Sequence, residues 1–151
     1  MKKLSLLVGG LVLMSVVATT VHAHHSFTMF DRDREEVIVG KVVRWAFNSP
    51  HVLMYLEDAD GNPWGFEGAA PPAVLGRTPG MDGFTFQPGQ ELTIIQCPLH
   101  DGRPGGALGF IVTEDGTWYN PSDGGCGPDE DEWREWLDSD YTSKAQAEAA
   151  N

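Results

Sequence analysis

Short runs of apolar and β-branched residues, separated by clusters of Gly, Pro, Asn and Asp, fill the chain between residues 37 and 119. Alternating apolar residues predict half-buried strands, and the clusters between them predict turns. No run in this region is long enough for an independent helical domain. Many short strands separated by turns are typical of a small antiparallel barrel or sandwich, so we predict an all-β fold.

The expected elements follow in the order strand, strand, strand, short helix, strand, strand and a very short strand. Their residues are 37–47, 51–58, 64–67, 70–77 (the helix), 91–97, 107–113 and 118–119. Pro71 and Pro72 can open the helix, because the fixed φ of proline is tolerated in a first turn. A single helix between the third and fourth strands predicts an OB-like barrel of five to six strands.

The first expected strand, residues 37–47, reads VIVGKVVRWAF. Its alternation predicts one buried face, which Lys41 interrupts. That face comprises Val37, Val39, Val43, Trp45 and Phe47. Gly40 indicates a bend or a bulge within the strand.

The first 23 residues have the features of a secretory signal peptide. Lys2 and Lys3 precede an apolar run over residues 4–17, and VHA follows at 21–23. This arrangement predicts cleavage after Ala23 and a mature chain that begins at His24, in the periplasm or outside the cell. An uncleaved anchor is the minor alternative, since the run is shorter than the roughly 20 residues of a spanning helix. We expect no membrane insertion after processing.

The chain is strongly acidic. Its formal net charge is −12, and removal of Lys2 and Lys3 with the signal peptide makes it −14. Such a charge repels phosphate backbones and anionic lipid surfaces, which excludes nucleic acid as an expected partner.

Cys97 and Cys126 are the two cysteines of the chain. In an oxidising compartment an isolated pair predicts a disulfide. It would close a loop of about 30 residues and contribute about 3 kcal/mol in the chain-entropy model. The alternative is two unpaired thiols, Cys97 in a strand and Cys126 in a Gly-rich loop.

Residues 24–36 form an N-terminal arm before the barrel domain (37–119), and residues 120–151 form a linker and an acidic tail. The tail carries one helical stripe of apolar residues: Trp133, Trp136, Leu137 and Tyr141. The stripe either docks on the barrel or binds a partner. We favour docking, because exposed tryptophans promote aggregation. Residues 143–151 are expected to fray.

Several motifs resemble those of an uncharacterised family of small exported bacterial proteins, defined by a domain of unknown function. They are AHHSF (23–27), FD (30–31), WAFNSPH (45–51) and the block PGQELTIIQCPLHDGRPGGALGFIVTEDGT (88–117). WAFNSPH resembles the family's W-x-x-N-P-H stretch, with Ser49 inserted, and His100 stands where the family pattern has Arg. The resemblance covers residues 24–119 and implies export and a small β domain, with no established reaction.

Processing gives His24 a free α-amine beside its imidazole. The amine and Nδ1 can chelate a metal, and a second imidazole completes the T-shaped arrangement of a histidine brace, which suits copper. Alternatively, the amine of His24, the following amide nitrogen and the imidazole of His25 bind Cu(II) in a plane. Imidazole must be neutral to bind, so affinity should fall below about pH 6.

Two further histidines lie in predicted loops that frame the ligand face of an OB-like barrel, His51 between strands one and two and His100 between strands four and five. We therefore predict a copper site among His24, His25, His51 and His100. The alternative is structural: a simple chain end at 24–25, a strand cap at His51 and an exposed turn residue at His100.

The sequence favours an exported soluble binding protein that holds copper through its processed N-terminal histidine. The alternative is a metal-free accessory module that binds an exported partner protein or a small apolar ligand. An enzyme is the least supported class, because no paired general acid and base is identifiable.

Overall fold

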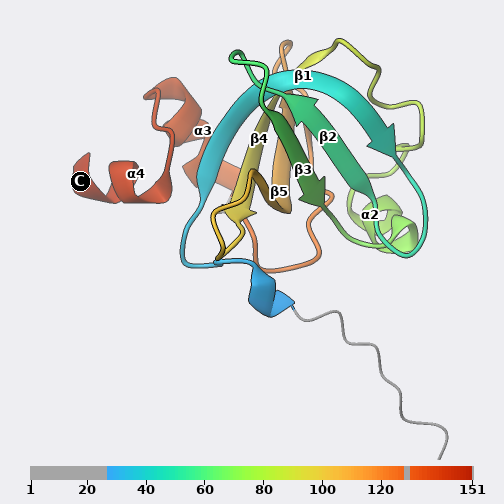
Figure 1. Ribbon diagram of the computed structural model, residues 1–151, viewed down its shortest axis with the longest axis horizontal. Coiled ribbons are helices and arrows are strands. Elements are labelled where there is room, and N and C mark those ends of the chain that lie inside the picture. Colours follow the sequence, from blue (N-terminus) through green and yellow to red (C-terminus); the bar gives the residue numbers. More distant parts are fainter. Residues whose placement is uncertain (1–26, 128–129, 151) are drawn as a thin grey trace, which may run out of the picture.

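The computed structural model of the chain describes residues 27–127 and 130–150 (Figure 1). Its elements are η1 (Phe27–Met29), β1 (Glu36–Ala46), β2 (Leu53–Glu57), β3 (Pro63–Glu67), α2 (Pro71–Arg77), β4 (Glu91–Pro98), β5 (Gly105–Thr113), β6 (Trp118–Tyr119), α3 (Glu130–Asp138) and α4 (Lys144–Ala150). The predicted signal peptide and two predicted ligands, His24 and His25, lie outside the described residues. No helix in the described part is long and apolar enough to cross a membrane.

Five strands close into a barrel. β1 pairs with β2 and β4, β2 with β3, and β4 with β5, all antiparallel. A parallel pairing of β3 with β5 closes the ring, and β6 adds to β5 outside it. The predicted β architecture, with one helix between β3 and β4, is confirmed.

Glycines make the closure possible. A Cβ on Gly105 would lie 2.1 Å from the carbonyl oxygen of Gly65, and one on Gly106 would lie 2.1 Å from that of Cys97. Gly105 also has a φ of +138°, which side chains disfavour. The β3–β5 contact therefore depends on residues without side chains.

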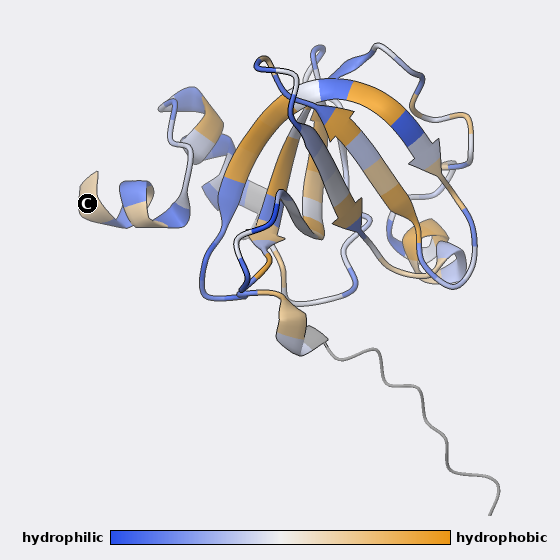
Figure 2. Cartoon of the chain, viewed as in Figure 1, coloured by the Kyte–Doolittle hydropathy of each residue, from blue (hydrophilic) through white to orange (hydrophobic). Residues whose placement is uncertain are grey.

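The main core fills the barrel, and α2 lies against it through the buried Val74. Trp45 packs edge-on against Phe86 at a centroid distance of 5.3 Å and donates its indole N–H to the carbonyl oxygen of Asp82, at 2.7 Å. Figure 2 shows hydrophobic residues concentrated on the barrel strands and hydrophilic residues on the connecting loops.

The predicted buried face of β1 is wrong for Val39 and Val43, which are 50% and 54% exposed, whereas Val42 is buried. The β1–β2 register shifts between Val42 and Arg44, so Val43 is the extra residue of a bulge. Because of this extra residue, the alternation of buried and exposed side chains along β1 changes phase at Val43. Trp45, beyond it, is buried as predicted.

Cys97 and Cys126 form the predicted disulfide. It lies in a small separate core with Phe30, Ala107 and the partly buried Leu99. The linker before α3 is thereby fixed to β4.

The aromatic stripe of the tail docks on the barrel, as predicted. Trp133 and Trp136 are buried against Ile95, Phe110 and Val112 of β4 and β5. Figure 1 shows α3 and α4 outside the barrel. The arrangement covers an apolar sheet face that would otherwise meet water.

The expectation that residues 143–151 fray is wrong for the described part, because 144–150 form α4 with Ala147 buried. The segment before α4 pairs with the start of β1. Val37 N donates to Thr142 O at 2.9 Å, and Lys144 N donates to Glu35 O at 2.9 Å. These long-range bonds anchor a helix that is too short to be stable alone.

Candidate functional site

The chain just after the N-terminal histidines is fixed to the β4–β5 connection. His100 N donates to Met29 O at 3.0 Å, and Asp31 N donates to Pro98 O at 2.8 Å. An antiparallel bridge joins Phe30 to Leu99 between these two bonds. The pairing brings η1 to the end of the barrel from which the β4–β5 connection projects (Figure 1).

Phe30 anchors this pairing through its side chain. The ring is buried against Cys97, Ala107 and Cys126, so the disulfide forms part of its packing surface. Burial of a phenylalanine contributes about 1.5–3 kcal/mol. The arm is therefore held by both backbone bonds and apolar packing.

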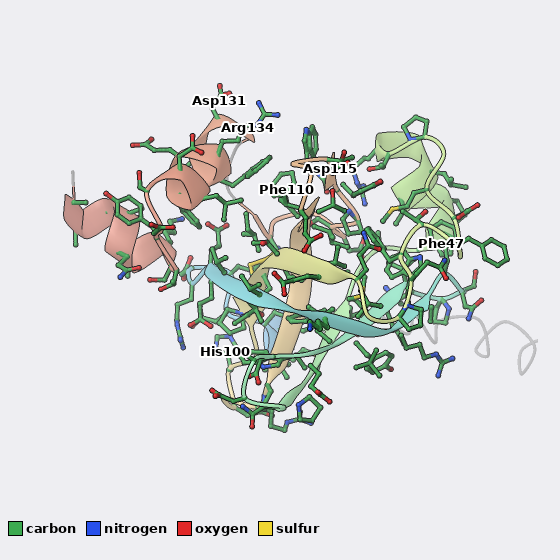
Figure 3. The ribbon with its side chains drawn as sticks, turned by 90° about the horizontal axis from the view of Figure 1, so that it is seen from above. Phe47, His100, Phe110, Asp115, Asp131 and Arg134 are labelled. Atoms are coloured by element: carbon green, nitrogen blue, oxygen red, sulfur yellow. A yellow bond between two sulfur atoms is a disulfide. The ribbon has the colours of Figure 1, made fainter. Side chains whose placement is uncertain are left out.

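His100 presents its imidazole to solvent, with 57% of the side chain exposed. It lies on the β4–β5 connection (Figure 3). Its Nδ1 is 3.8 Å from Oδ2 of Asp31, which is too far for a hydrogen bond but close enough for an ion pair when the ring is protonated. The backbone of His100 is thus fixed while its ring remains accessible.

His51 is held more tightly. Its Nδ1 lies 2.9 Å from the carbonyl oxygen of Gly68, and this geometry assigns the Nδ1–H tautomer. The same nitrogen is 3.4 Å from Oε1 of Glu67 and 3.9 Å from Oδ2 of Asp123, and the side chain is only 18% exposed. His51 therefore joins the start of β2 to the end of β3, which agrees with the structural alternative for this residue.

The two described histidines lie in different surroundings, His51 against the end of β3 and His100 against η1. Within residues 27–127 and 130–150, no three His, Cys, Asp or Glu side chains are grouped so that they could hold a metal ion. The structure therefore does not gather the predicted ligands within its described part.

A shallow pocket of about 240 Å³ lies beside the arm. Its walls come from the arm, β2, β3 and the β4–β5 connection: Met29, Phe30, Leu53, Tyr55, Gly65, Phe66, Glu67, Leu99, Arg103 and Gly106. Arg103 is paired with Asp101, with 2.8 Å between Nε and Oδ2. The pocket is mainly apolar, with charges at Glu67 and Arg103.

Sequence reasoning missed Phe30 and Asp31 as parts of this site. The FD pair at 30–31 was visible only as a family motif, and the motif does not reveal which distant strand it joins. The bridge to Leu99 supplies that information.

A family model matches residues 12–108, and the family is described as one of unknown function, DUF6152. The resemblance that the sequence motifs indicated is thereby confirmed. The match ends within β5, so β6, α3 and α4 lie beyond it. No curated protein and no solved structure matches the chain.

Proposed function

We propose that this chain, which belongs to the DUF6152 family of unknown function, is an exported protein that binds copper. The proposed ligands are the processed N-terminal His24 with His25, and the imidazole of His100. Cleavage after Ala23 and a location in the periplasm or outside the cell are parts of the proposal, and the Cys97–Cys126 disulfide is compatible with such a location.

The hydrogen bond from His100 N to Met29 O is the observation that carries the proposal. His24 precedes Met29 by five residues, and five extended residues span at most about 18 Å. The covalent chain therefore keeps the N-terminal amine within that distance of Met29, to which His100 is bonded. The imidazole of His100 is also far more accessible than that of His51, with 57% of the side chain exposed against 18%. Both observations support His100 as the additional imidazole.

Asp31 has a supporting role in the proposed site. Its Oδ2 is 3.8 Å from Nδ1 of His100. If metal binding closes this gap to a hydrogen bond, Nδ1–H of His100 would donate to Asp31 and leave the other ring nitrogen for the metal. We therefore expect Nε2 of His100 to bind copper.

We also propose that the barrel is OB-like. The ring order β1-β2-β3-β5-β4 and the position of α2 between β3 and β4 support this. In that architecture the connections β1–β2 and β4–β5 flank the ligand face, which is where His51 and His100 lie.

The decisive experiment compares mature protein that begins at His24 with protein that retains Ala23. Cu(II) affinity is measured by competition titration, and the nitrogen ligands are identified by electron paramagnetic resonance. The processed form should bind far more tightly, because only it has an amine on His24. Equal affinity of the two forms would exclude the amine as a ligand.

Two histidine variants of the processed form test the choice of third ligand. His100→Ala should lower Cu(II) affinity at least about tenfold, the usual cost of a lost contact to the metal site. His51→Ala is the matched control and should keep the affinity of the parent. The reverse result would replace His100 with His51 in the proposed site.

A metal-free accessory module is the second candidate function. Val39, Val43 and Tyr55 expose apolar surface on the outside of β1 and β2. Val43 and Tyr55 also line an apolar pocket of about 260 Å³, together with Pro63 and Trp64. This exposed apolar surface is the observation that favours the second candidate. The test is binding of a purified exported partner in the presence of chelator, which Val43→Asp should abolish.

A further inference from the structure

One carboxylate contacts two separate points of the C-terminal strap, by which we mean Gly127 and residues 130–150. Oε1 of Glu35 accepts a hydrogen bond from Gly127 N at 3.1 Å, at the root of the strap. Oε2 lies 4.0 Å from Nζ of Lys144, at the start of α4. The backbone oxygen of Glu35 accepts from Lys144 N at 2.9 Å.

The strap covers an apolar sheet face. Trp133 lies with its ring centroid 5.9 Å from that of Phe110 and 6.3 Å from that of Trp118. Trp136 is buried in the same cluster, which includes Ile95. Release of the strap would expose this face on β4 and β5.

Charge opposes the docking that the tryptophans favour. Acidic residues of the strap outnumber its basic ones, Arg134 and Lys144. Arg134 is itself placed over the Trp133 ring, at 5.2 Å from the centroid. The strap and the barrel both carry net negative charge, so they repel one another.

Protonation of Glu35 affects the balance between the apolar packing of the strap and its charge repulsion from the barrel. The residue is 5% exposed, and Oε2 accepts no hydrogen bond from any described group. Its neighbours across the interface are Lys144 and Glu148 on α4 and Glu132 on α3. On its own side, Arg34 and Glu36 flank it and pair with each other. Across the interface, one cation, Lys144, therefore stands against two carboxylates, Glu132 and Glu148, around the buried Glu35.

We infer that the strap is a pH-dependent cover, held closed by protonated Glu35 and loosened when that carboxyl ionises, so that the apolar face of β4 and β5 becomes accessible at higher pH. The inference is independent of copper binding.

The direction follows from the surroundings of Glu35. Burial raises the pKa of Glu35 above its ordinary value of 4.5; Lys144 and Gly127 N–H act against this, and Glu132 and Glu148 add to it. A raised folded-state pKa means that the stabilisation is fully present below pH 4.5 and is lost as the pH rises through the folded-state pKa. The cover is closed in acid and loosened in alkali.

Hydrogen exchange of the mature chain, measured at about pH 4.5 and about pH 8 and corrected for intrinsic rates, tests this. Protection within 130–150 should fall with rising pH, by about tenfold for each unit by which the folded-state pKa exceeds the ordinary one, while β4 and β5 keep theirs. Glu35→Gln should remove this fall. Glu36→Gln, the matched control, should keep it.

Lys144→Met provides a second variant, because it removes the cation that favours ionised Glu35. At about pH 8 the strap of this variant should be less protected than that of wild type. At about pH 4.5 the two should be equally protected. The inference is overturned if Glu35→Gln retains the full pH response. It is also overturned if the strap and the barrel strands always lose protection together, since that would be global unfolding.

Discussion

The amide of His100 donates to the carbonyl oxygen of Met29 at 3.0 Å. This bond fixes a residue of the β4–β5 connection to the last residue of η1. This bond connects two parts of the sequence that lie about 70 residues apart. It places Met29 beside the β4–β5 connection. The proposed copper site depends on that proximity.

Phe30→Ala tests the anchoring of the arm. The exchange removes a buried ring from the surface formed by Cys97 and Cys126, and we expect a loss of about 3 kcal/mol in the free energy of unfolding. Copper affinity should fall too, because the arm would no longer be held beside His100. Urea denaturation and Cu(II) titration measure the two effects.

Met29→Ala is the control for this prediction, because Met29 is 46% exposed, outside the buried core, and its carbonyl oxygen is retained. It should change neither quantity appreciably. Unchanged copper affinity in folded Phe30→Ala would contradict the role of the arm.

Loss of the disulfide should destabilise the whole chain. The double exchange Cys97→Ser and Cys126→Ser opens a loop closed over 29 residues and should lower the free energy of unfolding by about 3 kcal/mol. Reduced wild-type protein should show a similar loss in urea denaturation. If the oxidised parent and the double variant have equal stability, the bridge does not stabilise the fold.

Local patterns in the sequence predicted much of the fold. The succession of strands along the chain, the helix predicted at 70–77, the disulfide and the docking of Trp133 and Trp136 follow from periodicity, turn residues and composition. Each depends on neighbours in the chain or on a general rule about burial. The family motifs likewise indicated the correct family.

The features that sequence reasoning missed depend on distant contacts. The bulge at Val43 is defined only by the register against β2, and α4 is anchored by bonds to Glu35 and Val37. The partners of Asp31 and Glu35 are likewise remote in sequence. For the candidate site, the sequence pattern named His100 as a proposed ligand, and only the structure showed that its backbone pairs with Met29.

Gly106→Ala should be strongly destabilising. The added Cβ would lie 1.8 Å from Oε1 of the buried Gln96 and 2.1 Å from the backbone oxygen of Cys97, and the latter cannot move without disrupting β4. We expect a loss of more than about 3 kcal/mol, measured by thermal unfolding.

Gly61→Ala is the matched control for the barrel closure. Nothing lies within 4 Å of the added methyl, although the φ of +82° carries a penalty of about 1 kcal/mol. Equal losses for the two variants would contradict a cost that comes from the close approach of Gly106 to Gln96 and Cys97.

Asp58 should make stability depend on pH in strong acid. Its carboxylate accepts hydrogen bonds from Trp64 Nε1 at 2.9 Å and from Asn62 N at 2.8 Å, and these lower its pKa from 3.8 to about 2. A lowered folded-state pKa gives stabilisation that is present above pH 3.8 and lost as the pH falls through about 2. Asp58→Asn should therefore lower the melting temperature at neutral pH, and its difference from wild type should shrink between about pH 4 and pH 2. Thermal unfolding across this range measures the difference, and a constant difference would mean that the charge of Asp58 does not stabilise the β2–β3 turn.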